Sequence, residues 1–195
     1  MRTTGTLVAM GLLVLAAPVL AQDAGTVTVT ACQPCHGGAQ AAPTFPKLDG
    51  QHAAYLEKQL REYKSGKRKS DVMAPLIAAL KKGQIAGMAA HFAGQTPARG
   101  AVENQDLASR GKTLYEEGNR GSGVPACVGC HMANGTGAER YPRLAGQRQT
   151  YTVQQLADFK RGTRSNDRAH VMRAIAGRLT DDEMKAVAEY VAGLQ

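Results

Sequence analysis

The strongest constraint on the fold is a five-residue pattern that occurs twice, as CQPCH over residues 32–36 and as CVGCH over residues 127–131. Two cysteines three positions apart, with histidine directly after the second, are typical of covalent attachment of a c-type haem. One helical turn places residues i and i+3 on the same face, where two thiols can add to the two vinyl groups of one porphyrin. The next imidazole can then bind the iron from the proximal side. The candidate haem-binding residues are Cys32, Cys35, His36, Cys127, Cys130 and His131.

Other roles for paired cysteines fit this sequence less well. A thioredoxin-like redox pair needs strand–helix–strand surroundings, which the flanking sequence does not offer. A zinc site more often has its two cysteine pairs about 15–20 residues apart, whereas Cys35 and Cys127 are much further apart. A framework of disulfides does not explain a histidine at the same place twice. The pattern therefore favours two covalently bound haem c groups, each with its iron.

The start of the chain is not expected to be part of the fold. Arg2 is followed by an apolar run over residues 7–20, and small residues suit cleavage after Ala21. This pattern predicts a secretory signal peptide over residues 1–21. The run is too short for a comfortable transmembrane helix, and an uncleaved N-terminal anchor is the alternative. We therefore expect an exported protein located in the periplasm, the side on which bacteria complete haem attachment.

The charge of the chain restricts its partners. It has 24 lysines and arginines against 16 acidic residues, a formal net charge of +8. A basic exported protein is steered toward acidic partner proteins or anionic membrane surfaces, and nucleic acid is not expected as a partner in that compartment. The densest basic stretch, KSGKRK over residues 64–69, either docks a partner or forms a solvated loop after a helix.

The chain also contains an internal duplication. Aligned without gaps, residues 45–71 and 141–167 are identical at 11 of 27 positions. Such self-similarity indicates two copies of one structural unit. We predict an N-terminal haem domain over residues 22–95, a polar linker over residues 96–104 and a C-terminal haem domain over residues 105–195.

Helical periodicity dominates both copies, and strand signals are scarce, so the expected class is all-α. Apolar residues recur at steps of three and four over residues 51–65 and 147–161. Closing helices are expected at about 84–94 and 181–193, the second opening with a capping box. Residues 105–117 are predicted to form a helix ahead of the second haem motif. Before the first motif, residues 26–30 are all β-branched and favour an extended chain, so the first domain is expected to lack this leading helix.

The ligand on the far side of each iron decides between electron transfer and catalysis. Met132 directly follows a proximal histidine and cannot reach the opposite face. Two methionines fall on apolar positions of the closing helices, the usual place for this residue: Met88 and Met184. Met73 and Met172 occupy equivalent places, after the loop that follows each long helix, and are the expected distal ligands. His170 lies close to Met172 and is the competitor for that iron.

Thioether sulfur and imidazole together leave the iron no vacant position and raise its potential. Such a haem exchanges electrons and does not readily bind a substrate. The other N–H of an axial histidine usually meets a carbonyl or carboxylate, and Pro46 and Pro142 are spaced to supply that carbonyl.

Several polar residues of the duplicated segment remain open in role. Tyr55, Gln59, Arg68 and their equivalents either face the haem edge or propionates, or the tyrosines pack and the arginines are solvated. His52 and His91 have no histidine at the equivalent place, so both are expected to be exposed or satisfied within the core.

Taken together, the motifs resemble the dihaem cytochrome c4 family. Each CxxCH site is followed by F/Y-P-x-L-x-G-Q, by Y-x-x-x-Q-L, and then by G-x-R and a methionine, over nearly all of the chain after residue 21. The resemblance implies two tandem class I cytochrome c domains related by pseudo-twofold symmetry, with one c-type haem each and propionate edges near the domain interface. It implies His36 with Met73 and His131 with Met172 as axial pairs.

The resemblance further implies an electron carrier and not an enzyme. Family members work in the periplasm, often loosely attached to the membrane, and pass electrons from a quinol-oxidising complex or other donor to terminal oxidases. One alternative is the dihaem subunit of a larger oxidoreductase such as flavocytochrome c sulfide dehydrogenase. Another is a dihaem enzyme, either a peroxidase, for which the chain is short, or a thiosulfate-oxidising cytochrome, for which it has no spare cysteine ligand. The sequence does not indicate the oligomeric state.

Overall fold

The computed structural model describes residues 24–37 and 41–195, and within them the regular elements are helices. Strand-like pairing in this part of the chain is limited to isolated bridges, which confirms the all-α class. No helix among these residues is both long and apolar enough to span a bilayer. The predicted signal peptide, residues 1–21, lies outside the described residues.

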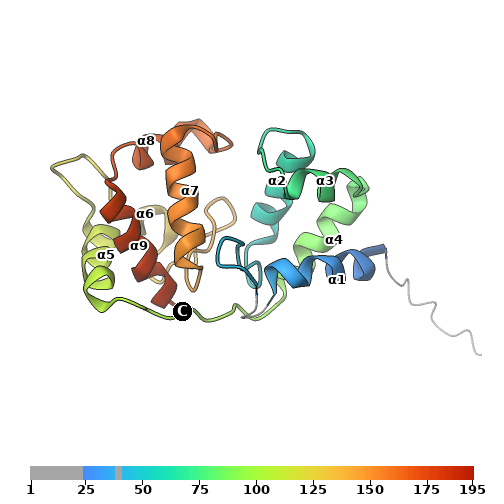
Figure 1. The fold of residues 1–195 in the computed structure, drawn as a ribbon, viewed down its shortest axis with the longest axis horizontal. Coiled ribbons are helices and arrows are strands. Elements are labelled where there is room, and N and C mark those ends of the chain that lie inside the picture. Colours follow the sequence, from blue (N-terminus) through green and yellow to red (C-terminus); the bar gives the residue numbers. More distant parts are fainter. Residues whose placement is uncertain (1–23, 38–40) are drawn as a thin grey trace, which may run out of the picture.

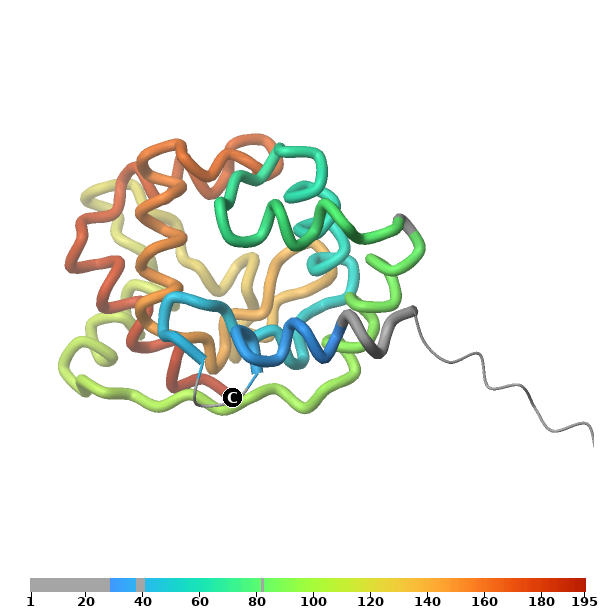
Figure 2. The backbone as a smooth tube through the Cα atoms, turned by 45° about the vertical axis from the view of Figure 1, so that its right-hand side comes forward, coloured from blue at the N-terminus to red at the C-terminus, as the bar shows by residue number. Residues whose placement is uncertain are grey.

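The helices form two units that lie side by side (Figure 1). The first unit contains α1 (Ala24–His36), α2 (Ala53–Lys64), α3 (Met73–Ala78) and α4 (Lys82–Ala93). The second contains α5 (Gln105–Glu117), α6 (Val128–His131), α7 (Gln149–Arg161), the 3₁₀ helix η1 (Arg168–His170), α8 (Val171–Ala176) and α9 (Asp181–Gly193). The segment between α4 and α5 includes the predicted linker and runs along one side of both units (Figure 2).

Each unit has its own apolar core, built in the same way. In the first unit, α4 packs against α1 and α2. The buried side chains of this core include Leu56, Ile77, Ile85, Met88 and Phe92. In the second, α9 packs against α5 and α7, and the buried side chains include Leu114, Tyr115, Leu179, Met184 and Val191. Met88 and Met184 are 2% and 1% exposed, which confirms their predicted place in the closing helices.

The expectation that the first unit lacks a leading helix is wrong. α1 includes the β-branched residues 26–30 and continues without a break into the first haem motif. Val29 is buried in the core of the first unit, and α1 lies against α4 as α5 lies against α9. Packing of this kind outweighs the weak preference of β-branched residues for extended chain. In the second unit, a loop separates the leading helix α5 from the motif helix α6.

Specific residues mark where helices begin and end. The Thr180 Oγ1 accepts the Glu183 N–H at 3.1 Å, and a Glu183 carboxylate oxygen accepts the Thr180 N–H at 2.8 Å, so the predicted capping box starts α9. After α2 and α7, the chain turns through Gly66 and Gly162 with φ of 76° and 74°. Glycine adopts this left-handed conformation without a steric penalty, and both turns lead toward the methionine-bearing segments.

Candidate haem sites

The first haem motif closes α1, which places its candidate ligating side chains on the last turns of one helix. Cys32 and Cys35 are half-buried thiols on the last turns of the helix, and His36 is 7% exposed. The Nδ1 of His36 lies 2.9 Å from the carbonyl oxygen of Pro46. Because a carbonyl can only accept, Nδ1 carries the proton and Nε2 keeps a lone pair for a metal.

The second motif repeats this arrangement in and just before α6. His131 is 8% exposed, and its Nδ1 lies 3.0 Å from the carbonyl oxygen of Pro142. Both contacts confirm the prediction that the two prolines supply the carbonyls. Burial lowers the pKa of His36 and of His131, which favours the neutral imidazole that a metal ligand requires.

The two candidate distal ligands take equivalent places. Met73 is the first residue of α3 and Met172 is the second residue of α8, and both side chains are half-buried. Met132 is 42% exposed and directly follows His131, in agreement with its exclusion. His170, the competitor of Met172, is exposed and lies in the left-handed region with φ of 60°.

The surroundings of these residues fit a porphyrin. Partly buried apolar side chains at equivalent positions of the two units pack against each core beside the motif cysteine: Leu48 and Leu60 in the first, Leu144 and Leu156 in the second. Each unit therefore offers two thiols on one helical face, an imidazole with a free Nε2, a thioether and an apolar wall. This donor set suits a covalently bound haem and has no carboxylate that would favour a hard metal ion.

Two buried glutamines join the units across a pseudo-twofold axis. The Gln51 side chain donates to the Arg143 carbonyl at 2.9 Å and accepts the Arg143 N–H at 2.8 Å. The Gln147 side chain donates to the Lys47 carbonyl at 3.0 Å and accepts the Lys47 N–H at 2.9 Å. Each glutamine thus pairs with the backbone of the other unit as one strand would pair with another. From the sequence alone, these glutamines stand out only as part of the repeat.

Two arginines reach across the same interface, so of the two alternatives left open by the sequence, the one with solvated arginines is wrong. Arg68, 7% exposed, donates to the Tyr151 hydroxyl at 3.2 Å and to the Gln155 side chain at 2.8 Å. Arg164 makes the equivalent bonds to the first unit, through Tyr55 and Gln59. Each guanidinium also lies over an aromatic ring of its own unit. Identity in both copies was the available signal, but it did not show that the partners were in the other domain.

The predicted basic stretch over residues 64–69 is not one free patch. Lys64 donates to the backbone carbonyls of Ala78 and Leu80, Lys67 pairs with Glu62, and Arg68 is buried. Since Lys64, Lys67 and Lys69 are exposed, the stretch is mainly a solvated loop after α2, and only Arg68 departs from that expectation. Docking of a partner by this stretch stays a prediction.

The two unpaired histidines also differ from each other. The Nε2 of His52 lies 2.8 Å from the carbonyl oxygen of Thr136 in the other unit, a cross-domain role that the sequence analysis missed. His91 is exposed, as expected.

Comparisons with known proteins place the chain among c-type cytochromes. A family model described as cytochrome c matches residues 108–195. A cytochrome c4 of Azotobacter vinelandii is 40% identical over 185 residues, which cover 88% of this chain and 88% of that protein. The crystal structure of reduced recombinant cytochrome c4 from Pseudomonas stutzeri is similar with a TM-score of 0.83 and 37% identity, over 88% of this chain and 97% of that chain. A protein of Stutzerimonas stutzeri strain A1501 named thiosulfate dehydrogenase electron acceptor is 36% identical over 182 residues, 90% of this chain and 84% of that protein.

Proposed function

The chain belongs to the cytochrome c4 family, and we propose that it carries electrons in the periplasm from a quinol-oxidising complex or similar donor to a terminal oxidase or other acceptor. It is a dihaem electron-transfer cytochrome and not an enzyme, and it holds two covalently bound haem c groups. The family resemblance predicted from the sequence, with its two tandem class I domains, is thereby confirmed.

The proposal assigns each haem its residues in this chain. Cys32 and Cys35 bind the first porphyrin, with His36 and Met73 on the iron, and the equivalent set binds the second: Cys127, Cys130, His131 and Met172. The haem supplies the one-electron chemistry. The observation that carries this assignment is the Nδ1 contact of each proximal histidine with a proline carbonyl, because it leaves Nε2 directed away from the backbone. With an imidazole and a thioether of the chain as its ligands, each iron would be closed to substrates.

The net charge supports the choice of partners. The formal charge is +8, and it becomes +7 (23 basic minus 16 acidic residues) when Arg2 leaves with the signal peptide. This charge favours association with acidic surfaces of redox proteins and peripheral contact with an anionic membrane. Export by cleavage after Ala21 belongs to the same proposal, since partners of this kind are reached from the periplasm.

A second candidate function is that of electron acceptor for a thiosulfate-oxidising dehydrogenase. The specific support is the relative of that name, which matches 90% of this chain. The chain would again be the carrier, and the oxidation of thiosulfate would belong to the partner. Reduction of the ferric protein by such a dehydrogenase, compared with reduction by a quinol-oxidising complex at equal concentrations, separates the two donors.

One spectrum tests the haem assignment. Ferric protein should show the weak near-infrared charge-transfer band of sulfur-to-iron ligation at a strength that matches two haems, and the reduced protein should not bind carbon monoxide. Ready binding of carbon monoxide by the unaltered protein would show an open iron and would contradict the carrier function.

A further inference from the structure

The loop that leads to Met172 carries backbone strain that its counterpart in the first unit does not have. The connection from α7 to α8 contains the 3₁₀ helix η1, whereas the connection from α2 to α3 contains no such helix. Inside η1, Ala169 and His170 have φ of 50° and 60°. Residues other than glycine adopt this region at an energetic cost, so contacts around the loop must hold its conformation.

One anchor lies within the second unit. The Asp167 carboxylate accepts the Arg173 guanidinium at 2.6 Å and the Arg173 backbone N–H at 3.1 Å. The Asp167 side chain is 4% exposed. This pair closes the strained loop onto α8, at the residue next to Met172.

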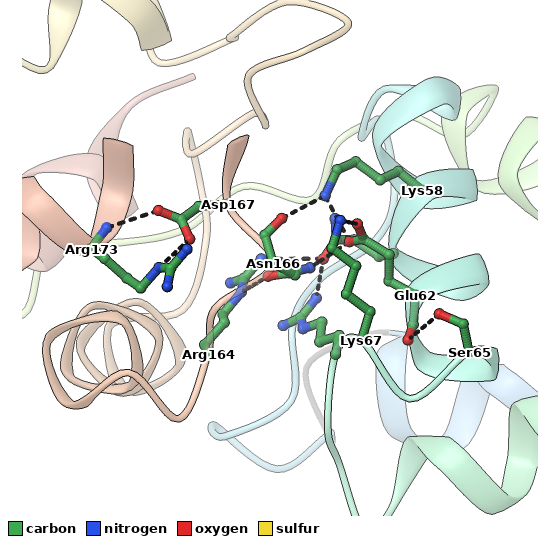
Figure 3. A network of polar contacts seen from close by, with 10 residues as sticks. Lys58, Glu62, Ser65, Lys67, Arg164, Asn166, Asp167 and Arg173 are labelled. Carbon is green, nitrogen blue, oxygen red and sulfur yellow. Dashed lines mark hydrogen bonds and ion pairs between the residues drawn. The ribbon is translucent and has the colours of Figure 1, made fainter. Parts of the chain in front are cut away.

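The other anchor lies in the first unit. Asn166 precedes Asp167 and points the opposite way, toward α2 (Figure 3). Its side-chain N–H₂ donates to the Glu62 carboxylate at 2.7 Å and to Gln59 at 2.9 Å, and Asn166 is only 2% exposed. Lys58 donates both to Glu62 at 2.6 Å and to the Asn166 carbonyl at 2.9 Å. The loop is therefore fixed to a buried ionic group of the other domain.

This anchor has no mirror image, although most of the interface is pseudo-symmetric. The residue equivalent to Glu62 is Asp158, whose carboxylate bonds stay within its own unit, to Gln154, Arg161 and Thr163. The residue equivalent to Asn166 is Ser70, which accepts the Met73 N–H at 3.1 Å. Among the described residues, the first methionine segment is thus held locally and the second is held from across the interface.

We propose that Glu62 and Asn166 are positioning residues for Met172, so that the first domain holds the distal ligand of the second haem in place. The inference rests on the proposed function, in which Met172 binds the second iron. The contact acts through the loop: Asn166 fixes its start on α2, and Asp167 fixes its end on Arg173. Loss of the contact between Asn166 and Glu62 frees the start of the loop and lets its strained residues, Ala169 and His170, relax. Met172 is then held less firmly on its iron, whereas Met73 is not affected.

The test replaces Asn166 by serine, the residue found at the equivalent position, Ser70, in the first domain. Asn166→Ser is too short to reach Glu62, and Glu62→Asp, a second variant, shortens the partner instead. Each is made in a Met73→Ala background, where the remaining near-infrared band reports on Met172 alone. Imidazole added to the ferric haem protein competes with the methionine, and its apparent affinity rises as the bound fraction of methionine falls. A coupling of the usual size for such networks raises that affinity about 2- to 30-fold.

The matched control is the same substitution in a Met172→Ala background, where the band reports on Met73. There the affinity for imidazole should not change. An unchanged affinity in both backgrounds overturns the proposal, and an equal rise in both overturns it too, because it would mark general destabilisation. A Met73→Ala protein with no remaining band would instead refute Met172 as an iron ligand, and the positioning role would be refuted with it.

Discussion

The Nδ1 of His36 lies 2.9 Å from the carbonyl oxygen of Pro46, and the equivalent pair, His131 and Pro142, is 3.0 Å apart. In each unit the backbone thus selects the tautomer and the orientation of the proximal imidazole. Since the partner is a backbone carbonyl, which does not titrate, the orientation of each ring does not depend on the ionisation of a neighbouring side chain. On the proximal side of both sites, a backbone carbonyl holds the histidine ring in place.

Replacement of either proposed distal ligand should open one iron. Met73→Ala and Met172→Ala are each expected to remove about half of the near-infrared band, because each haem contributes one sulfur-to-iron bond. Each reduced variant should then bind carbon monoxide at one haem per chain, measured by optical titration.

The chain supplies matched controls for this experiment in its buried methionines. Met88→Leu and Met184→Leu are expected to keep the full band and to cost less than about 1.5 kcal/mol of unfolding free energy, since the exchange nearly conserves volume. A band that weakens in these variants as much as in the alanine variants would contradict the ligand assignment.

Removal of an interface glutamine should weaken the contact between the units. Gln51→Ala leaves the N–H and the carbonyl of Arg143 without their partner, so the free energy of unfolding in urea is expected to fall by about 1–3 kcal/mol. Gln147→Ala should cost a similar amount, because it makes the equivalent bonds to Lys47. The control is Gln154→Ala at an exposed site, expected within about 0.5 kcal/mol of the unaltered protein. Equal costs at Gln51 and Gln154 would count against the role of the glutamine pair.

Acid should remove the contribution of Glu62. Burial by itself raises the pKa of this carboxyl, but the hydrogen bonds from Lys58 and Asn166 outweigh burial and hold the pKa below its ordinary value of 4.5. A pKa that is depressed in the folded state stabilises the protein at pH above the unfolded value, and this stabilisation is lost as the pH falls through the folded value. The difference in unfolding free energy between the unaltered protein and Glu62→Gln should therefore be constant above about pH 5 and shrink below about pH 4.5. A difference that grows on acidification would have the wrong sign.

The start of α9 should depend on its capping threonine. Thr180→Ala removes the acceptor of the Glu183 N–H and is expected to lower the unfolding free energy by about 1 kcal/mol. Lys81 occupies the same position before α4, but its ammonium group has no acceptor to offer. Lys81→Ala should therefore change the stability by less than about 0.5 kcal/mol, and a larger loss there than at Thr180 would contradict the capping role.

Much of this protein was predictable from local patterns. The spacing of the cysteines and histidines indicated two haems, and the duplication singled out Met73 and Met172 among the methionines. The helical class, the buried places of Met88 and Met184 and the proline carbonyls behind the proximal histidines were all predicted and confirmed. These features depend on residues a few positions apart, or on the comparison of one copy with the other, and both kinds of information can be read along the chain.

Only the tertiary structure decided how the two copies meet. Residues 26–30 form helix despite their β-branched side chains, because α1 gains a core contact through Val29. Arg68 bonds to Tyr151 and Asn166 to Glu62, yet these partners are far apart in the sequence and no local period links them. The sequence by itself determined what each half can hold. The fold decided which side chains are buried between the halves, because a buried polar group must find its partner wherever the folded chain brings one.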